Sequence, residues 1–578
     1  MNTIEVILFI VAVVGVIGLG IWKSNSGAKG QGKSASDYFL AGRGLSWWLV
    51  GFSLIAANIS TEQFVGMSGS AANWLGMAIA SYEWMAAITL VIVGFFFLPR
   101  FLKTGLYTIP EFLEYRFDVT ARMAMAVPAV VTLVFVTTSS VIFSGGKFVS
   151  EYYNTVPVLN NLTAVCWLIG AFAAIYVFIG GLKACAWTDL VWGSALIVGG
   201  AVVMFMAFHV LGNKPAEELI QTKVANSNAT VEDIEQAGAW SRFMLLNDGV
   251  DGEAIAVDGP NGSGGKVHMV RPKTDTDLPW TALLIGLWIP NFFYWGLNQY
   301  IVQRTLGSKS LAEGQKGIVF AAFLKLLIPF LVVIPGILAY NLFSADLFNA
   351  ATGTYDYDRA FPVLVRNLIK PYPLISWFVL AALSGAVISS LASMLNSAST
   401  IATMDLYSRI SKQKDPEKLV KVGRSLVIVF VVLASLVAPR LDNFTSIFAY
   451  IQEFQGFISP GILAVFIFGF FSPRTPRYFG WVGIVVNAVF YALIKWVLGD
   501  IITQNGWWYS NEIAFLDRMA ICFFIVVLVG VLLTIISPLK RPVTMPENKE
   551  IEVTTSRSAQ IMGGGVIVAT IALYAIFW

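Results

Sequence analysis

The sequence predicts an all-α membrane protein. Of its 578 residues, 57% are hydrophobic and only 13% are charged, whereas soluble domains carry about 25% charged residues. The hydrophobic residues gather in segments of about 20 residues, the length that crosses the hydrocarbon core of a bilayer. The formal net charge of +3 is small for this length, and the basic residues do not gather on one face, which argues against nucleic acid as a partner.

About fourteen segments reach or approach the spanning length. They are residues 6–21, 47–71, 77–98, 121–148, 162–179, 187–210, 279–301, 317–340, 374–404, 422–438, 444–470, 480–498, 513–536 and 561–577. The first segment has no basic leader and no small-residue cleavage site, so we expect an uncleaved membrane helix. The cysteines, Cys166, Cys185 and Cys522, lie in or beside apolar segments and predict no disulfide framework.

The distribution of lysine and arginine between the connections predicts an N terminus outside the cell. The inward connections then hold basic residues that include Lys29, Lys33, Arg304, Lys309, Lys316 and six between positions 409 and 424. Residues 211–278 are polar and carry both signs of charge, so we expect an external loop there. The absence of cysteine from the outer loops favours a bacterial inner membrane.

Two apolar segments are interrupted in related ways. Residues 47–71 contain the polar run Asn58-Ile59-Ser60-Thr61-Glu62-Gln63, and residues 279–301 contain Pro290, Asn291 and Gly296. Paired broken helices at corresponding places in two halves point to an inverted-repeat transporter with a binding site near the bilayer midplane. Five helices' worth of chain separates the two breaks, as two five-helix repeats require.

Five ionisable residues lie within or at the ends of apolar segments: Glu62, Glu83, Asp189, Lys325 and Glu453. An ionisable group near the bilayer centre costs about 2.5 to 3.5 kcal/mol, so each needs a partner, water or a ligand. Lys325 could pair with Glu62 or Glu83 only to permit burial, or it could line a polar substrate cavity. For Asp189, near an inner helix end, a solvated carboxylate and a transport role both stay open.

Hydroxyl residues form a ladder along residues 374–404: Ser389, Ser390, Ser393, Ser397, Ser399 and Thr400. Small residues of this kind also favour helix packing in membranes. For Ser389 and Ser390 we prefer a sodium site, because sodium is a hard ion that binds several oxygens. Two hydroxyls and the freed carbonyls of a broken helix supply such oxygens without a full negative charge.

Amide side chains lie close to aromatic residues around both interruptions. The amides include Gln63, Asn291 and Gln452, and the aromatic residues include Tyr294 and Phe448. Sugar hydroxyls need both donors and acceptors, while the apolar face of a sugar ring packs on an aromatic side chain. This combination therefore suits a neutral polyhydroxylated ligand.

Nearly the whole chain resembles the sodium/solute symporter family, within it the sodium/glucose cotransporter type, and most closely the bacterial sodium/galactose symporter. The resemblance is carried by SLIAANISTEQFVGMSGS from Ser53, ASYEWM from Ala80, NFFYWGLNQYIVQRTL from Asn291, KGIVFAAFLK ending at Lys325, AVISSLASMLNSASTIATMDLY from Ala386 and AYIQEFQGFISPGILAVF from Ala449. It implies a LeuT-like fold, a 5+5 inverted repeat with flanking helices. Residues 1–46 would hold an additional helix and inner loop, 47–471 the ten-helix core (first repeat 47–210, external loop 211–278, second repeat 279–471), and 472–578 three further helices.

The resemblance also implies roles for individual residues. The carbonyls of Ala56, Ile59 and Ala386 and the hydroxyls of Ser389 and Ser390 would bind sodium, with Asp189 on the sodium path. Sugar binding would fall to Gln63, Glu83, Asn291, Lys325 and Gln452, with Glu62 nearby. Tyr294 would close the sugar site from inside, bonded through Asn58, while Met67 and Phe448 would cover it from outside.

Two positions depart from the family pattern. Ala86 stands where the galactose symporter pattern has a serine beside the sugar, which leaves galactose and glucose both open. Ala392 stands where cotransporters with a second sodium site have a hydroxyl residue, so we expect one sodium ion per sugar. No organic cofactor is expected, and the oligomeric state is left open.

Other functions compete with sugar symport. Lys325 could hold a carboxylate, which would make the solute a sugar acid or an amino acid; a polyol is a further alternative. A transporter-like sensor would need a cytoplasmic signalling domain, and the inward connections are only a few tens of residues long. An enzyme is disfavoured, because His209 and His268 have no metal-binding spacing.

Overall fold

The computed structural model describes residues 3–25, 40–224, 227–249, 265–350, 353–444, 446–548 and 551–578. In these ranges the chain is mainly helical, with one short antiparallel hairpin of β1 (Phe348–Asn349) and β2 (Thr354–Tyr355). Lys29 and Lys33 of the predicted inner loop, and residues 250–264 of the predicted external loop, lie outside the described residues.

The helices fall into four groups along the chain. The first comprises α1 (Thr3–Asn25), α3 (Trp47–Asn58), α4 (Ser68–Ala72), α5 (Ser81–Phe96), α6 (Leu98–Thr104), α7 (Ile109–Arg116), α8 (Val119–Val131), α9 (Ser139–Tyr152) and α10 (Leu162–Asn213). The external segment holds α11 (Ala216–Leu219), α12 (Val231–Gln236) and α13 (Ala239–Asn247). The third comprises α14 (Trp288–Leu297), α15 (Gln299–Leu306), α16 (Leu311–Leu347), α17 (Ala360–Ile369), α18 (Pro373–Ile401), α19 (Ser408–Ser411), α20 (Pro416–Val437), α21 (Ile447–Gly456) and α22 (Ser459–Phe471). The last comprises α23 (Phe479–Leu493), α24 (Gly499–Gln504), α25 (Phe515–Ile536) and α26 (Arg557–Ile576).

Short segments of other helical types extend several of these helices. Five are π-helical: η2 (Gln63–Met67), η4 (Thr132–Thr138), η6 (Ala282–Gly286), η8 (Ala402–Tyr407) and η10 (Ile494–Leu498). Another, the 3-10 turn η7 (Tyr357–Arg359), follows the hairpin. Because π segments re-aim side chains within a helix, η2 directly after the first interruption affects how the following polar residues are presented.

Within the described ranges, nine helical stretches are long and apolar enough to cross a membrane, or ten if one bent pair is counted as a span. Four shorter apolar helices, Val11–Gly20, Trp47–Asn58, Leu162–Phe178 and Ala282–Leu297, fall in the remaining predicted segments. The chain is therefore a multi-pass membrane protein, and the count of about fourteen spans stays a prediction.

The stretch α10 contains two of the predicted segments. The Tyr176 hydroxyl lies 2.7 Å from the Thr188 hydroxyl, although twelve residues of straight helix would separate them by about 18 Å. The stretch is therefore not one straight helix between its two apolar parts, Leu162–Phe178 and Cys185–Asn213. The predicted boundary between 162–179 and 187–210 lies between these two parts.

The first interruption lies where the sequence places it. Helix α3 ends at Asn58, and Ile59 has extended backbone angles (φ −85°, ψ 104°). The Ser60 N–H donates to Gln63 Oε1 at 2.9 Å and so does not continue the helical ladder to Ala56. A buried stretch of non-helical backbone in a membrane needs such side-chain partners.

The second interruption lies at the end of the predicted stretch. Pro290 and Asn291 lie inside α14, and the break is at Asn298 (φ −80°, ψ 122°) between α14 and α15, two residues after Gly296. Pro290 does not end the helix, which runs from Ala282 to Leu297. The Asn298 carbonyl accepts from the Val302 N–H at 3.0 Å and so begins α15.

A third interruption was not predicted. The expected single segment 444–470 consists of α21 and α22, which meet at an angle of 44°. The residues at the bend follow Gly456 and precede Pro460, which stands in the first turn of α22. A Cβ at Gly456 would lie 2.2 Å from the Tyr491 ring, so only glycine permits this approach.

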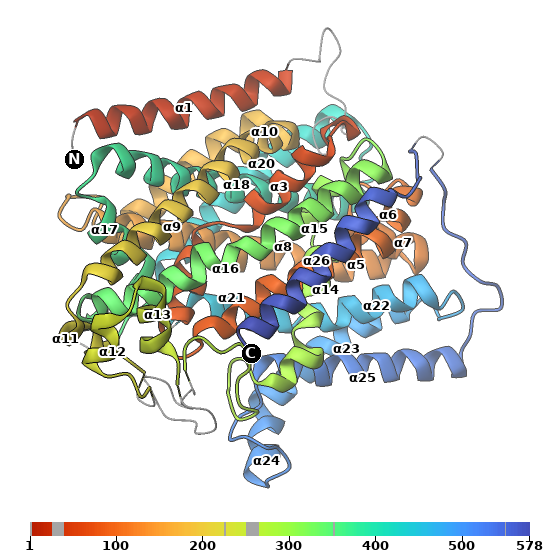
Figure 1. Ribbon diagram of the computed structural model, residues 1–578. Coiled ribbons are helices and arrows are strands. Elements are labelled where there is room, and N and C mark those ends of the chain that lie inside the picture. Colours follow the sequence, from red (N-terminus) through yellow and green to blue (C-terminus); the bar gives the residue numbers. More distant parts are fainter. Residues whose placement is uncertain are drawn as a thin grey trace.

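The long helices form one bundle around α16. Helix α16 packs against α3, α5 and α10, and α18 packs against α10. Figure 1 shows α1 along the upper edge of the bundle and α25 along the lower edge, with α11, α12 and α13 gathered at the left end of the helices. Helix α26 crosses the front and packs against α5 and α16.

Candidate functional site

A cavity lies between the two interrupted spans, and the space between its lining atoms, with the open solvent at its mouth included, is about 590 Å³. It brings together all ten residues predicted for the sugar site and its covers: Asn58, Glu62, Gln63, Met67, Glu83, Asn291, Tyr294, Lys325, Phe448 and Gln452. They come from six parts of the chain (α3, η2 with the residue before it, α5, α14, α16 and α21). The convergence of so many separate segments gives the cavity its mixed polar and aromatic lining.

Lys325 holds the polar side of the cavity together. Its ammonium group forms an ion pair with Glu83 and donates a hydrogen bond to the side-chain oxygen of Asn58, Oδ1. It also lies 4.8 Å from the centre of the Trp295 ring. Of the two partners considered from sequence, Glu83 is the one that pairs. Lys325 is therefore both ion-paired and part of the cavity wall.

Tyr294 closes the side of the cavity next to the first break. The Asn58 amide donates to the Tyr294 hydroxyl at 2.8 Å, which is the contact expected from the resemblance. The Tyr300 hydroxyl, which the sequence analysis did not single out, also donates to Tyr294. Tyr294 is thereby fixed by one residue from each interrupted span.

Several polar atoms of the cavity have hydrogen-bonding capacity to spare. The side-chain oxygen of Gln63 accepts from the Ser60 N–H, which leaves its amide nitrogen available. The side-chain nitrogen of Asn291 donates to the Leu287 carbonyl at 3.0 Å, which leaves its side-chain oxygen available. Glu62 Oε2 and Gln452 Oε1 have no partner among the described residues. Buried polar atoms without partners are costly, and a ligand rich in hydroxyl groups would supply both the donors and the acceptors that are missing.

An aromatic pair covers the other side of the cavity. The rings of Tyr82 and Phe448 meet edge to face with centroids 4.9 Å apart. A Cβ at Gly66 would lie 2.8 Å from Ile447 and 3.3 Å from Phe448, so glycine lets the start of α21 approach η2. Tyr82, together with Gln455 of α21, lines the cavity without having been predicted.

The 3-10 turn η7 contacts the start of α21. Asp358 Oδ2 accepts a hydrogen bond from the Ile447 N–H at 3.3 Å. Burial, and then the charge of Asp356, raise the pKa of Asp358 to about 7. A carboxylate at a helix N terminus is stabilised by the free N–H groups there, so this contact helps to hold Phe448 over the cavity.

The predicted sodium ligands lie beside the cavity, at the other side of the first break. The Ser390 hydroxyl of α18 is 3.4 Å from the carbonyl oxygens of Ala56 and of Ala57. Ile59 is the extended residue at which α3 ends, and Ala386 lies one turn before Ser390 on α18, buried. Ala57 was not predicted, although any carbonyl in the last turn of a helix lacks a helical partner. These oxygens, without a formal charge, have the chemistry that a sodium ion requires.

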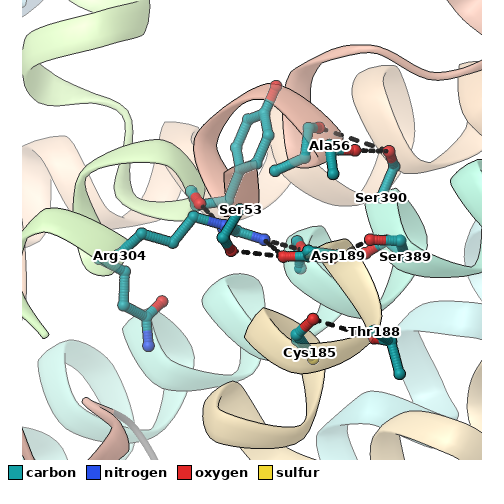
Figure 2. A network of polar contacts seen from close by, with 12 residues as sticks. Ser53, Ala56, Cys185, Thr188, Asp189, Arg304, Ser389 and Ser390 are labelled. Carbon is teal, nitrogen blue, oxygen red and sulfur yellow. Dashed lines mark hydrogen bonds and ion pairs between the residues drawn. The ribbon is translucent and has the colours of Figure 1, made fainter. Parts of the chain in front are cut away.

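Asp189 lies in a fully buried ion-pair network next to these oxygens (Figure 2). Its carboxylate accepts from Ser53 at 2.5 Å and from Ser389, and it pairs with Arg304 at 3.2 Å. The Arg304 guanidinium also donates to Ser53 at 2.7 Å and to Ser393. The solvated position considered for Asp189 is wrong, because the residue is 0% exposed.

Arg304 was placed in an inward connection by sequence, and this placement is wrong. The residue is 0% exposed and lies on α15, the helix after the second break. The counting of basic residues could not detect this, because the apolar segment was expected to end at residue 301. The motif NQYIVQRTL in fact continues as a buried helix whose arginine faces Asp189.

A continuous chain of contacts joins the two sites. Arg304 donates to the Tyr300 carbonyl, and the Tyr300 hydroxyl donates to Tyr294. Tyr294 accepts from Asn58, which in turn accepts from Lys325. Through Asp189, which pairs with Arg304 and accepts from Ser389, the chain links the Ser389 hydroxyl to the polar side of the cavity through both interrupted spans.

Comparisons with known proteins agree with this geometry. A profile of the Sodium:solute symporter family matches residues 38–486. A sodium/glucose cotransporter of Vibrio parahaemolyticus is 38% identical over 100% of this chain and 99% of its own length. The uncharacterized symporter YidK of Escherichia coli is 32% identical over 100% of this chain and 91% of its own length.

The fold is also found among solved structures. A Na⁺-coupled sialic acid symporter in a substrate-bound outward-open state superposes with a TM-score of 0.70, over 93% of this chain and 99% of its own. Its sequence identity is 22%, so this likeness concerns the fold alone. The predicted LeuT-like fold is confirmed.

Proposed function

Because the chain belongs to the sodium:solute symporter family and is a transporter rather than an enzyme, we propose that its solute is a neutral monosaccharide, galactose or glucose, carried with one sodium ion by alternating access. The observation that supports this most is that the cavity and the predicted sodium ligands both include residues at the end of α3. Asn58 lines the cavity, while the carbonyls of its neighbours Ala56 and Ala57 face Ser390. One short break in one helix thus contributes to both.

The charges of the cavity favour an uncharged solute. Its ionisable side chains are Glu62, Glu83 and Lys325, and Lys325 already pairs with Glu83. A sugar acid or an amino acid would bring a carboxylate into this cavity, where the one lysine of the described lining is already paired, and a buried carboxylate without a cation of its own is unfavourable. The spare amide and carboxyl groups match sugar hydroxyls instead.

Coupling between ion and sugar follows from the break. Sodium at the Ala56 and Ala57 carbonyls would fix the end of α3 and with it Asn58, Lys325 and Tyr294. The free-energy cost of ordering these residues on sugar binding would then be smaller, so sodium would raise the affinity for the sugar. By linkage, the sugar would raise the affinity for sodium by the same factor. The contacts through Arg304 and Tyr300 provide a second connection between the sites.

A stoichiometry of one sodium ion per sugar is supported by Arg304. Its guanidinium already supplies the positive charge that Asp189 needs, and Ala392 offers no hydroxyl ligand. A membrane potential of about 100 mV contributes ~2.3 kcal/mol per charge, and a tenfold sodium gradient about 1.4 kcal/mol. One ion would therefore sustain a sugar gradient of at most about 500-fold.

Uptake into proteoliposomes tests the solute class. We expect labelled galactose or glucose to accumulate above the external concentration under an inward sodium gradient, and not when potassium replaces sodium. Unlabelled neutral hexoses should compete, whereas uronic acids, amino acids and polyols should not. Competition by a sugar acid would assign the cavity to anions, and binding without accumulation would indicate a sensor.

Replacing Gln63 by alanine should raise the KM for the sugar by about fivefold or more, since one hydrogen bond between neutral groups contributes about 1 kcal/mol and the Ser60 N–H also loses its acceptor. Initial uptake rates against sugar concentration provide the measurement. Gln315→Ala is the matched control, because Gln315 is equally buried on α16 but bonds to Gly94 and Ser556, away from the cavity. An unchanged KM in the Gln63 variant would remove Gln63 from the site.

We further propose the topology and the division of the chain expected from sequence. The N terminus would lie outside a bacterial inner membrane, residues 47–210 and 279–471 would form the two repeats, and 472–578 the C-terminal helices. One contact supports the opposite direction of the two broken spans: Leu45, just before α3, forms a parallel bridge with Ser308, just after α15. The beginning of the first broken span and the end of the second are thus side by side.

A further inference from the structure

Helix α21 forms one wall of the cavity but is held from behind by the C-terminal helices. Phe448, Ile451, Gln452 and Gln455 of this ten-residue helix line the cavity. Glu453, which follows Gln452, lines no part of it and contacts α23, η10 and α25 instead. The C-terminal helices therefore touch the element that covers the solute site.

One oxygen of Glu453 gathers three donors. Glu453 Oε1 accepts from the Tyr491 hydroxyl at 2.8 Å and from Arg518 at 2.8 Å, and Lys495 lies 3.1 Å away. These four residues, the Glu453 cluster, are partly buried: the side chains of Glu453, Arg518 and Lys495 are 24%, 13% and 29% exposed. A single carboxylate thus balances two cations that would otherwise repel each other.

The end of α21 is fixed by the same helix that carries Tyr491. The Asn487 amide of α23 donates to the carbonyls of Phe457 at 2.7 Å and Gly456 at 3.3 Å. The Tyr491 ring lies against Gly456 and meets the Phe457 ring at 4.7 Å. The bend after α21 and the Glu453 cluster together determine the angle at which α21 leans over the cavity.

We propose that Glu453 is a positioning residue for solute binding: through Tyr491, Lys495 and Arg518 it holds α21, and so sets the position of Gln452 and Phe448 over the cavity. It does not touch the solute. The proposal rests on the cavity being the solute site. It assigns to the C-terminal helices, which contribute no side chain to the lining, a part in solute affinity.

The kinetic test compares Glu453→Gln with the unchanged protein in proteoliposomes. We expect the KM for the sugar to rise by about tenfold, because Gln452 and Phe448 lose their fixed position. The sodium concentration for half-maximal uptake at saturating sugar should stay the same, since the predicted sodium ligands lie on α3 and α18. Equal shifts in both constants, or none in the KM, would overturn the proposal.

Two further variants separate positioning from general disturbance. Glu114→Gln is the matched control, because Glu114 also balances two cations, Arg122 and Arg409, and is 20% exposed. The helix that carries Glu114, α7, lines no part of the described cavity, and the KM of this variant should be that of the unchanged protein. The double variant Glu453→Gln/Arg518→Gln should be no worse than Glu453→Gln alone. Additive losses would mean that Glu453 does not act through Arg518.

A labelling measurement tests the position of α21 without any sugar. The native cysteines Cys166, Cys185 and Cys522 are buried, so a cysteine introduced as Ile451→Cys can be followed with a water-soluble maleimide. We expect severalfold faster labelling when Glu453→Gln is added. An unchanged rate would contradict the proposal even if the solute proves not to be a sugar. Failure of sugar uptake in the unchanged protein would instead contradict the proposed function.

Discussion

Replacing Ser390 by alanine is expected to abolish sodium-driven uptake while the protein stays folded and inserted. The Ser390 hydroxyl faces the Ala56 and Ala57 carbonyls at 3.4 Å, so the change removes one oxygen from a small set of uncharged ligands. Hard cations bind through several oxygens, and the lost hydroxyl leaves an apolar methyl group beside the two carbonyls. The loss of sodium affinity behind this effect should be at least about tenfold, the equivalent of 1.4 kcal/mol.

The measurement is the initial rate of sugar uptake against sodium concentration. Ser399→Ala provides the control on the same helix, because Ser399 is equally buried and its hydroxyl donates to the Asn396 carbonyl of its own helix at 3.0 Å. Its sodium dependence should be that of the unchanged protein. A Ser390 variant that transports normally would show that the cation binds elsewhere.

Replacing Asp189 by alanine is expected to have the largest effect on stability. It would leave the Arg304 guanidinium buried with no anion, and breaking a buried ion pair costs about 3 to 5 kcal/mol. The double variant Asp189→Asn/Arg304→Met should recover most of this loss, because a neutral pair of similar size carries no unpaired charge. Transport should stay impaired in both variants. The single variant loses the contacts of Asp189 to Ser53 and Ser389, and the double variant also loses those of Arg304 to Tyr300 and Ser393.

The first part of this prediction is measured by heating the protein in detergent and determining the fraction that stays monodisperse at each temperature. Asp233→Asn in the external segment serves as the control, because Asp233 is exposed and bonds only to its neighbour Thr230 in α12's capping turn. If Asp189→Ala unfolds at the temperature of the unchanged protein, Arg304 does not depend on Asp189. If the double variant is as unstable as the single one, the loss does not arise from the unpaired charge.

The sequence predicted those parts of the site that the bilayer makes costly. A polar run such as Asn58 to Gln63 inside an apolar segment has few explanations other than a broken helix beside a cavity, and the break lies there. The ionisable residues Glu83 and Lys325 were expected to need partners, and they are partners of each other. These inferences need only local sequence and the properties of the membrane.

The parts that sequence missed depend on contacts between distant segments. Of the three residues expected to mark the second break, Gly296 lies two residues before it, whereas Pro290 and Asn291 lie within the helix that ends at Leu297. From the sequence, Arg304 was assigned to a loop. In the structure it lies on α15, the helix that follows the break, and pairs with Asp189. Glu453 was recognised as needing partners, but Tyr491, Lys495 and Arg518 lie 38 to 65 residues further along the chain. No local pattern identifies such partners.

The central claim, that one break in the second span builds adjoining and coupled sites for sodium and a sugar, is tested most directly by sugar binding to the purified protein. The dissociation constant for galactose or glucose should be at least about fivefold lower in sodium than in potassium, the lower end of ordinary coupling between sites. In the Ser390→Ala variant the constant should be the same in both salts and equal to the potassium value of the unchanged protein. An identical constant in sodium and potassium for the unchanged protein would contradict the account.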